Sequence, residues 1–199
     1  MIVRLSKKMA AYFAINGIIK SEDVEVYEYG LQILLSTICN GIIAVLIALV
    51  TGTFWQCVCY LTVFILLRKS AGGFHAKTHL GCCCILAAAL GIFILFIRFV
   101  PVNTYAIISA IAVVFSTIMI AHYAPLEHKN KPIHDKDRKR LRRNSIIYTV
   151  AISVIIFVLG MTKHEEIMVC LSLGMLTATA SMFAAVVQNK FEGAILKNS

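Results

Sequence analysis

The sequence predicts an all-α membrane protein with six transmembrane helices, preceded by an N-terminal amphipathic helix on the membrane surface. Apolar residues make up 59% of the 199 positions, and the mean hydropathy is +0.83, whereas soluble domains are about 45–50% apolar. These residues lie in continuous runs rather than in alternation, which favours membrane helices over a β-barrel. A chain of this length cannot bury so much apolar surface in one water-soluble core, so we expect lipid to cover the remainder.

Six apolar runs are long enough, or nearly so, to cross a bilayer, which takes about 20 helical residues. They cover residues 30–51, 54–68, 82–100, 104–122, 145–161 and 167–187. The run 54–68 is short and would need neighbouring residues or a thinner bilayer. Residues 1–20 mix basic and apolar side chains, as a helix on the membrane surface does. Because the sequence shows no long linker or internal repeat, residues 1–199 are expected to form a single integral membrane domain.

The formal net charge of +9 is best explained by orientation in the membrane rather than by nucleic-acid binding, so no nucleic-acid partner is expected. If the N-terminus lies in the cytoplasm and the spans alternate, every Lys and Arg except Arg98 and Lys163 lies on or near the cytoplasmic side. This asymmetry supports both the six-span count and a multi-pass protein whose N- and C-termini are cytoplasmic.

The segment between the second and third predicted spans carries the groups of a cysteine peptidase. Two glycines at 72–73 free the backbone, two histidines follow at His75 and His79, and three cysteines at 82–84 begin the next helix. Exposed N–H groups at a helix N-terminus stabilise a thiolate. A nearby imidazole can take the thiol proton and later protonate a leaving amine.

Spacing leaves the pairing of histidine and cysteine open. In one continuous helix, His75 and Cys82 would lie about two turns apart, so His75 would have to occupy a bent or looped segment. His79 competes for the same role, because it precedes Cys82 by three residues and Cys83 by four.

Two other interpretations of this segment compete with catalysis. The cysteines could be small packing residues of an apolar helix, with the histidines at the membrane interface. Alternatively, His75 and His79, one helical turn apart, could bind zinc together with a cysteine. No nearby acid plays the part of the glutamate in H-E-x-x-H, so we expect neither a metal ion nor a cofactor.

One motif carries a resemblance to a known family. Arg68, then Gly73-Phe74-His75-Ala76, and then Cys82 seven residues after the histidine resemble the AgrB (accessory gene regulator B) family of quorum-sensing peptide processors. Residues 123–133, from Tyr-Ala-Pro to Lys-Pro-Ile, are similar to the family's cytoplasmic loop between spans four and five, and Gly30-Leu31-Gln32 resembles its Gly-x-Gln element. The resemblance covers nearly the whole chain.

This resemblance implies a cysteine endopeptidase in the bacterial plasma membrane, with His75 as the base and Cys82 as the nucleophile. Such an enzyme removes the C-terminal tail of an AgrD-like propeptide through a thioester on Cys82. It then promotes closure of a thiolactone or lactone ring, which yields an autoinducing peptide. Gln32 is implied as an orienting or oxyanion group, although a helix–helix hydrogen bond would account for it equally well.

Two further residues of the motif and a set of basic side chains also receive expected roles. Arg68 is expected to position the loop or to contact lipid phosphate or substrate, and Gly73 to supply backbone conformation or close approach. A set of basic side chains is expected to anchor the cytoplasmic loop, and could also contact the propeptide tail or anionic lipid. These are Lys129, Lys131, Arg138, Lys139, Arg140, Arg142 and Arg143.

A peptide or small-solute transporter without protease activity is the main alternative, and a non-catalytic membrane scaffold is a third. The predicted spans carry almost no ionisable residue except Arg98, whereas solute pathways usually need intramembrane polar groups. A homodimer is a further expectation, because small residues in and between the spans allow close helix packing. These are Gly41, Gly52, Ala88, Gly91, Gly160 and Gly174.

Overall fold

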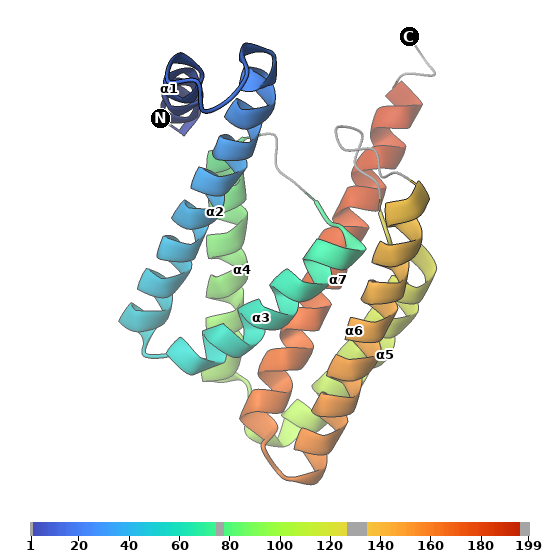
Figure 1. Cartoon of the computed structure of the whole chain (residues 1–199). Coiled ribbons are helices and arrows are strands. Elements are labelled where there is room, and N and C mark those ends of the chain that lie inside the picture. The colour runs from blue at the N-terminus through green and yellow to red at the C-terminus, as the bar shows by residue number, and fades with distance from the viewer. Residues whose placement is uncertain (1, 75–77, 127–134, 196–199) are drawn as a thin grey trace. The chain divides into compact units, whose positions relative to one another are not determined.

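The computed structural model describes residues 2–74, 78–126 and 135–195. Within these ranges the regular structure is entirely helical, with seven α-helices, two 3₁₀ turns and no β-strand (Figure 1), so the predicted all-α class is confirmed. The elements are α1 (Ile2–Ile15), η1 (Ser21–Asp23), α2 (Val24–Thr51), α3 (Phe54–Ala71), α4 (His79–Phe99), η2 (Val102–Thr104), α5 (Tyr105–Tyr123), α6 (Asp135–Met161) and α7 (Glu165–Ile195).

Five of the described helical segments are long and apolar enough to cross a membrane. They are Ser21–Thr51, Leu80–Phe99, Val102–Tyr123, Asp137–Met161 and Glu165–Gln188. They correspond to all of the predicted spans except the second, whose counterpart α3 ends with the basic pair Arg68 and Lys69. The 18 residues of α3 extend only about 27 Å, against about 30 Å for the hydrocarbon core of a bilayer. The count of six spans therefore stays a prediction.

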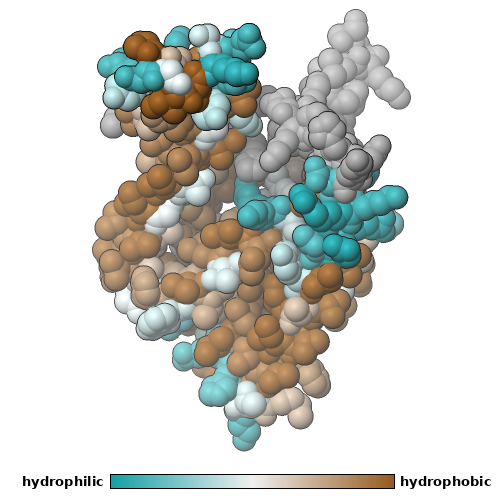
Figure 2. All heavy atoms as spheres, in the orientation of Figure 1, coloured by the Kyte–Doolittle hydropathy of each residue, from teal (hydrophilic) through white to brown (hydrophobic). Residues whose placement is uncertain are grey.

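The helices reach beyond the apolar runs that predicted them. Helix α6 begins at Asp135 rather than near residue 145, and α7 continues to Ile195 rather than ending near residue 187. An apolar run marks only the part of a helix that lipid covers, whereas the backbone hydrogen bonds continue into charged sequence. Figure 2 shows hydrophobic side chains covering the middle of the helices, with hydrophilic ones gathered toward helix ends.

The chain divides into two compact units. They are Met1–Gly52 with Ala76–Gly91, and Thr53–His75 with Ile92–Ser199. In the first unit, α1 packs across the beginning of α2 (Figure 1) and buries Ser6 and Ala10, which share one helix face. The location of α1 on a membrane surface stays a prediction.

In the second unit, α3, α5 and α7 run in the same direction. Near the beginnings of α5 and α7, the Ser172 hydroxyl donates to the Ser109 hydroxyl oxygen at 3.0 Å. At the opposite ends, the Leu126 N–H donates to the Ala71 carbonyl oxygen at 2.9 Å, so α3 ends beside the end of α5. The core between these helices includes Tyr60 of α3, whose hydroxyl donates to Thr177 of α7 at 2.9 Å.

A glycine on α7 allows α3 to approach closely, and we expect Gly174→Ala to destabilise the protein. A Cβ at Gly174 would overlap the carbonyl oxygen of Tyr60 and would lie 3.2 Å from Val63 Cβ. Because a backbone oxygen cannot rotate away, the helices would have to separate, at a cost of about 1–3 kcal/mol. The measurement is the melting temperature of the purified protein in lipid nanodiscs.

Gly91→Ala on α4 is the matched control, because a Cβ at Gly91 would meet no atom within 4 Å and alanine favours helix. Equal melting temperatures for the two variants would contradict this account of α3–α7 packing. Gly174 thus contributes to packing within the chain, whereas Gly41 and Gly91 face open space. The homodimer stays a prediction.

Candidate functional site

Cys82 lies in the first turn of α4, within the first unit, and its sulfur faces α2. The Asn40 side-chain Nδ2 donates a hydrogen bond to Cys82 Sγ at 3.6 Å, and Cys82 is half-buried. The helix begins at His79, three residues before the predicted start of the span. The physical reason is a cap: the Thr78 hydroxyl oxygen accepts the Gly81 N–H at 3.1 Å, as an N-cap side chain does.

The three consecutive cysteines occupy different environments. Cys82 and Cys83 are half-buried, whereas Cys84 is exposed. Successive residues of an α-helix point about 100° apart around its axis. Only one of the three sulfurs can therefore take the direction of Asn40, and it is the Cys82 sulfur that does so.

Gln32 lies on α2 in the same unit, but toward its N-terminal end. Its Nε2 donates to Glu28 Oε1 at 3.3 Å, one helical turn earlier. The separation from Asn40 along α2 is about 12 Å, so the structure brings Asn40, and not Gln32, to the Cys82 sulfur. The implied oxyanion role of Gln32 stays a prediction.

In the second unit, α3 and α7 hold the backbone of Phe74, the residue before His75. The Phe74 N–H donates to the Ser181 carbonyl oxygen at 3.0 Å and to its Oγ at 3.2 Å. The Arg68 guanidinium donates to the Phe74 carbonyl oxygen and to Ser181 Oγ at 3.4 Å, and it lies 5.4 Å from the centre of the Phe64 ring. Both backbone groups of Phe74 are therefore fixed. His75 itself lies outside the described residues, so its role stays a prediction.

The two glycines that precede Phe74 are both tightly enclosed. Gly72 has φ +83°, and a Cβ there would lie 2.7 Å from the carbonyl oxygen of Leu126. A Cβ at Gly73 would lie 2.8 Å from Ser181 Oγ. A side chain at Gly72 would thus meet backbone, and one at Gly73 would meet a hydroxyl.

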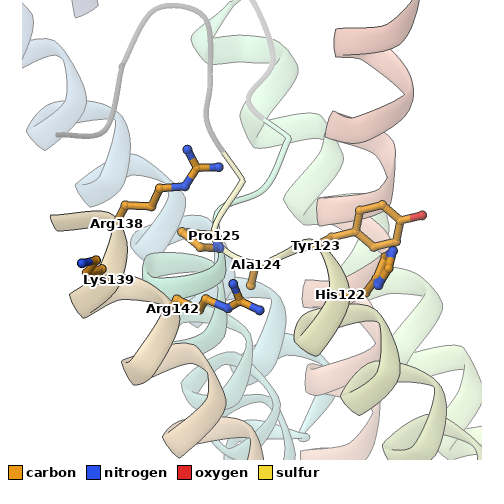
Figure 3. Close-up of a pocket in the computed structure, with 7 residues that line it drawn as sticks. All are labelled: His122, Tyr123, Ala124, Pro125, Arg138, Lys139 and Arg142. Atoms are coloured by element: carbon orange, nitrogen blue, oxygen red, sulfur yellow. The ribbon is translucent and has the colours of Figure 1, made fainter. Parts of the chain in front are cut away.

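A basic pocket lies where α5 ends and α6 begins. Its volume is about 230 Å³, and its lining consists of His122, Tyr123, Ala124, Pro125, Arg138, Lys139 and Arg142. Figure 3 shows Arg142 extending from α6 toward Ala124. Guanidinium groups beside a lysine favour a carboxylate or a phosphate as ligand.

The other predicted basic residues are placed differently. Arg140 pairs with Asp137 at 3.0 Å and is largely exposed. Arg143 lines a second, more apolar hollow of about 350 Å³ together with Ile146 and Ile147. Lys129 and Lys131 lie outside the described residues.

Two contact residues in these sites were missed in the sequence, namely Asn40 and Ser181. The sequence did contain a signal for Asn40, namely a polar amide inside an apolar run. Such an amide needs hydrogen-bond partners within the protein, which marks it as a candidate contact residue. Ser181 carried no such signal, since serine is a common small residue of membrane helices.

Comparison with known proteins places the chain in a family. The family described as Accessory gene regulator B (AgrB) matches residues 6–184. A putative AgrB-like protein of Clostridium perfringens (strain SM101 / Type A) is 26% identical over 187 residues, which cover 87% of each chain. The accessory gene regulator protein B of Staphylococcus haemolyticus (strain JCSC1435) is 29% identical over 159 residues, 77% of this chain and 81% of the relative.

A third relative, a putative AgrB-like protein of Halalkalibacterium halodurans, is 24% identical over 192 residues, 96% of this chain and 94% of the relative. No solved structure matches the chain. Because the family match spans most of the sequence, the chain belongs to the AgrB family and has a role in accessory gene regulator quorum sensing.

Proposed function

We propose that this protein is a cysteine endopeptidase of the plasma membrane that removes the C-terminal tail of an AgrD-like propeptide and promotes its cyclisation. The observation that carries the proposal is the placement of Cys82. Its sulfur lies in the first turn of α4, half-buried and in contact with a polar amide of α2, within the region that matches the family.

The proposed reaction begins with attack of the Cys82 thiolate on a peptide carbonyl near the C-terminal end of the propeptide. A sulfur–carbon bond forms, the carbon–nitrogen bond breaks, and the leaving amine takes a proton from His75 in its imidazolium form. The N-terminal part of the propeptide remains on Cys82 as a thioester. A Cys or Ser side chain of the propeptide then gives its proton to the now neutral His75 and attacks this thioester, which closes the thiolactone or lactone ring, breaks the bond to Cys82 and releases the Cys82 thiolate. Limited access of water at the lipid boundary would suppress hydrolysis.

The proposed topology has six spans, with both termini in the cytoplasm and α1 on the membrane surface. The common direction of α3, α5 and α7 in the second unit supports it, because alternate spans of a multi-pass protein must run in the same direction. The end of α3 lies beside the end of α5, where the basic segment at the start of α6 favours the cytoplasmic side.

Intact mass spectrometry tests the proposal. The protein in lipid nanodiscs is incubated with synthetic AgrD-like propeptides encoded near its gene. We expect an adduct whose added mass equals the propeptide without its tail, mapped by digestion to Cys82. Absence of both adduct and tail cleavage with every such propeptide would contradict the proposal and favour the transporter alternative.

We further propose that the basic pocket receives the charged tail of the propeptide. Its three cationic side chains, Arg138, Lys139 and Arg142, come from one face and end of α6, and an acidic tail would complement them. The double variant Arg138→Gln/Arg142→Gln is therefore expected to raise the KM for tail cleavage roughly three- to tenfold at low salt, with a smaller effect at high salt.

Arg140→Gln is the matched control for this prediction, because Arg140 lies on the same helix but does not line the pocket. Its KM should stay near that of the wild type. An unchanged KM in the double variant, with membrane insertion intact, would refute tail capture. The residues would then serve as a positive-inside anchor or as a contact to anionic lipid.

A further inference from the structure

The side chain of Asn40 lies in a position that lowers the stability of the fold. Its Nδ2 donates to a sulfur at 3.6 Å, and sulfur is a weak acceptor. Among the described residues, its Oδ1 is one of three buried side-chain oxygen or nitrogen atoms with no hydrogen-bond partner. A buried polar atom without a partner costs stability. A leucine at this position would avoid that cost, so the stability of the fold does not explain the amide.

The position of the amide relative to Cys82 suggests a use for it. When a thiolate attacks a carbonyl, the carbonyl oxygen becomes an oxyanion on the same carbon that has bonded to sulfur. The oxyanion therefore forms beside the sulfur. An amide N–H that contacts Cys82 Sγ in the free protein lies close enough to donate to that oxygen once substrate is bound.

We propose that Asn40 is a catalytic residue whose Nδ2–H groups stabilise the oxyanion formed when Cys82 attacks the propeptide. In this step the sulfur–carbon bond forms while the π electrons of the carbonyl move to its oxygen. The Asn40 amide stabilises the resulting negative charge by donating a hydrogen bond to that oxygen. The carbonyl then re-forms as the carbon–nitrogen bond breaks and the amine leaves with its added proton. The inference rests on the proposed peptidase activity and adds to it the group that stabilises the intermediate.

Asn40 suits this role better than the other polar side chains of α2. Gln32 donates to Glu28 and lies about two turns from the level of Cys82. The Thr37 hydroxyl donates to the Ile33 carbonyl of its own helix and is exposed. An oxyanion donor must be in position before the reaction, and the 3.6 Å contact to Cys82 places the Asn40 amide beside the nucleophile.

The test compares Asn40→Leu and Asn40→Ala with the wild type and with the control Thr37→Val, all in lipid nanodiscs. The substrate is the synthetic propeptide that forms the adduct with the wild type. Four quantities are measured: the kcat and KM of tail cleavage, the melting temperature, and the rate at which iodoacetamide alkylates Cys82, followed by peptide mapping. Alkylation is informative because it displaces iodide from carbon without forming an oxyanion.

We expect both Asn40 variants to lose roughly 100-fold or more in kcat, as removal of one oxyanion donor does. KM and the alkylation rate should stay within about threefold of the wild type, and the melting temperature of Asn40→Leu should equal or exceed it. Thr37→Val should cleave normally. Asn40→Ala avoids the added bulk of leucine, so a folding defect specific to Asn40→Leu leaves the comparison intact.

Tail cleavage within about threefold of wild type in the Asn40 variants would overturn the inference while leaving the peptidase standing. An equal loss of cleavage and of alkylation would also overturn it, because the amide would then act on the sulfur rather than on the oxyanion. A wild type that neither cleaves nor forms an adduct would remove the proposed function itself, and the role of Asn40 with it.

Discussion

Tail cleavage is expected to disappear when Cys82 is replaced by alanine, and to persist when Cys83 or Cys84 is replaced. The reason is the direction of the sulfur atoms around α4. Cys82 contacts Asn40, whereas the next two residues point about 100° and 200° away from it, and Cys84 is exposed. Loss of the nucleophile removes the covalent pathway altogether, so we expect at least a 10³-fold lower rate.

The measurement is the rate of tail release from the synthetic propeptide, followed by liquid chromatography and mass spectrometry. The double variant Cys83→Ala/Cys84→Ala is the matched control, because it keeps Cys82 as the single cysteine of the run. Its rate should lie within about threefold of the wild type. Full cleavage by Cys82→Ala would rule out a Cys82 thioester. If the control variant does not cleave while Cys82→Ala does, the nucleophile is Cys83 or Cys84 rather than Cys82.

The helical membrane class follows from the sequence because lipid imposes a simple physical condition. Every backbone group in the hydrocarbon region must be bonded within the chain, so a long apolar run can only be a buried or lipid-covered helix. The residues at which helices begin and end cannot be predicted in this way. Thr78 begins α4 through its hydroxyl, and α6 begins within a charged segment at Asp135, where hydropathy gives no signal.

The candidate site could be predicted only where its residues are close together in the chain. Cys82, in a helix-initiating segment after glycines and histidines, could be proposed from one stretch of sequence. Asn40 could not be assigned to it, because the two residues are 42 positions apart and meet only when α2 and α4 pack. The contact between Phe74 and Ser181 spans 107 positions and depends in the same way on the crossing of α3 and α7.

Replacement of Gly72 or Gly73 by alanine is expected to reduce tail cleavage strongly, but for different reasons. A Cβ at Gly72 would lie 2.7 Å from the Leu126 backbone oxygen, at a φ of +83° that alanine adopts only at a cost. A Cβ at Gly73 would lie 2.8 Å from Ser181 Oγ. Either change should displace Phe74 and the residue after it, and a displacement of about 1 Å near a reacting group can cost about 100-fold in rate.

The two variants should differ in how they respond to a second substitution. Ser181→Ala removes the Oγ that a Cβ at Gly73 would meet, while the Ser181 carbonyl still accepts the Phe74 N–H and Arg68 still donates to the Phe74 carbonyl. We therefore expect Gly73→Ala/Ser181→Ala to cleave about as fast as Ser181→Ala alone. Gly72→Ala/Ser181→Ala should stay as slow as Gly72→Ala, because no side-chain truncation moves the Leu126 backbone oxygen.

Rates of tail cleavage for these five variants, together with their melting temperatures, form a double-mutant test of the loop anchor. If Ser181→Ala restores cleavage to Gly73→Ala but not to Gly72→Ala, activity depends on the packing of residue 73 against α7. The reason is that a Cβ at Gly73 would meet a side chain, whereas a Cβ at Gly72 would meet backbone. An equally inactive Gly73→Ala with and without Ser181→Ala would exclude Ser181 as the cause. It would instead indicate that position 73 needs the backbone freedom of glycine. Position 72 already needs that freedom, because Gly72 has a positive φ.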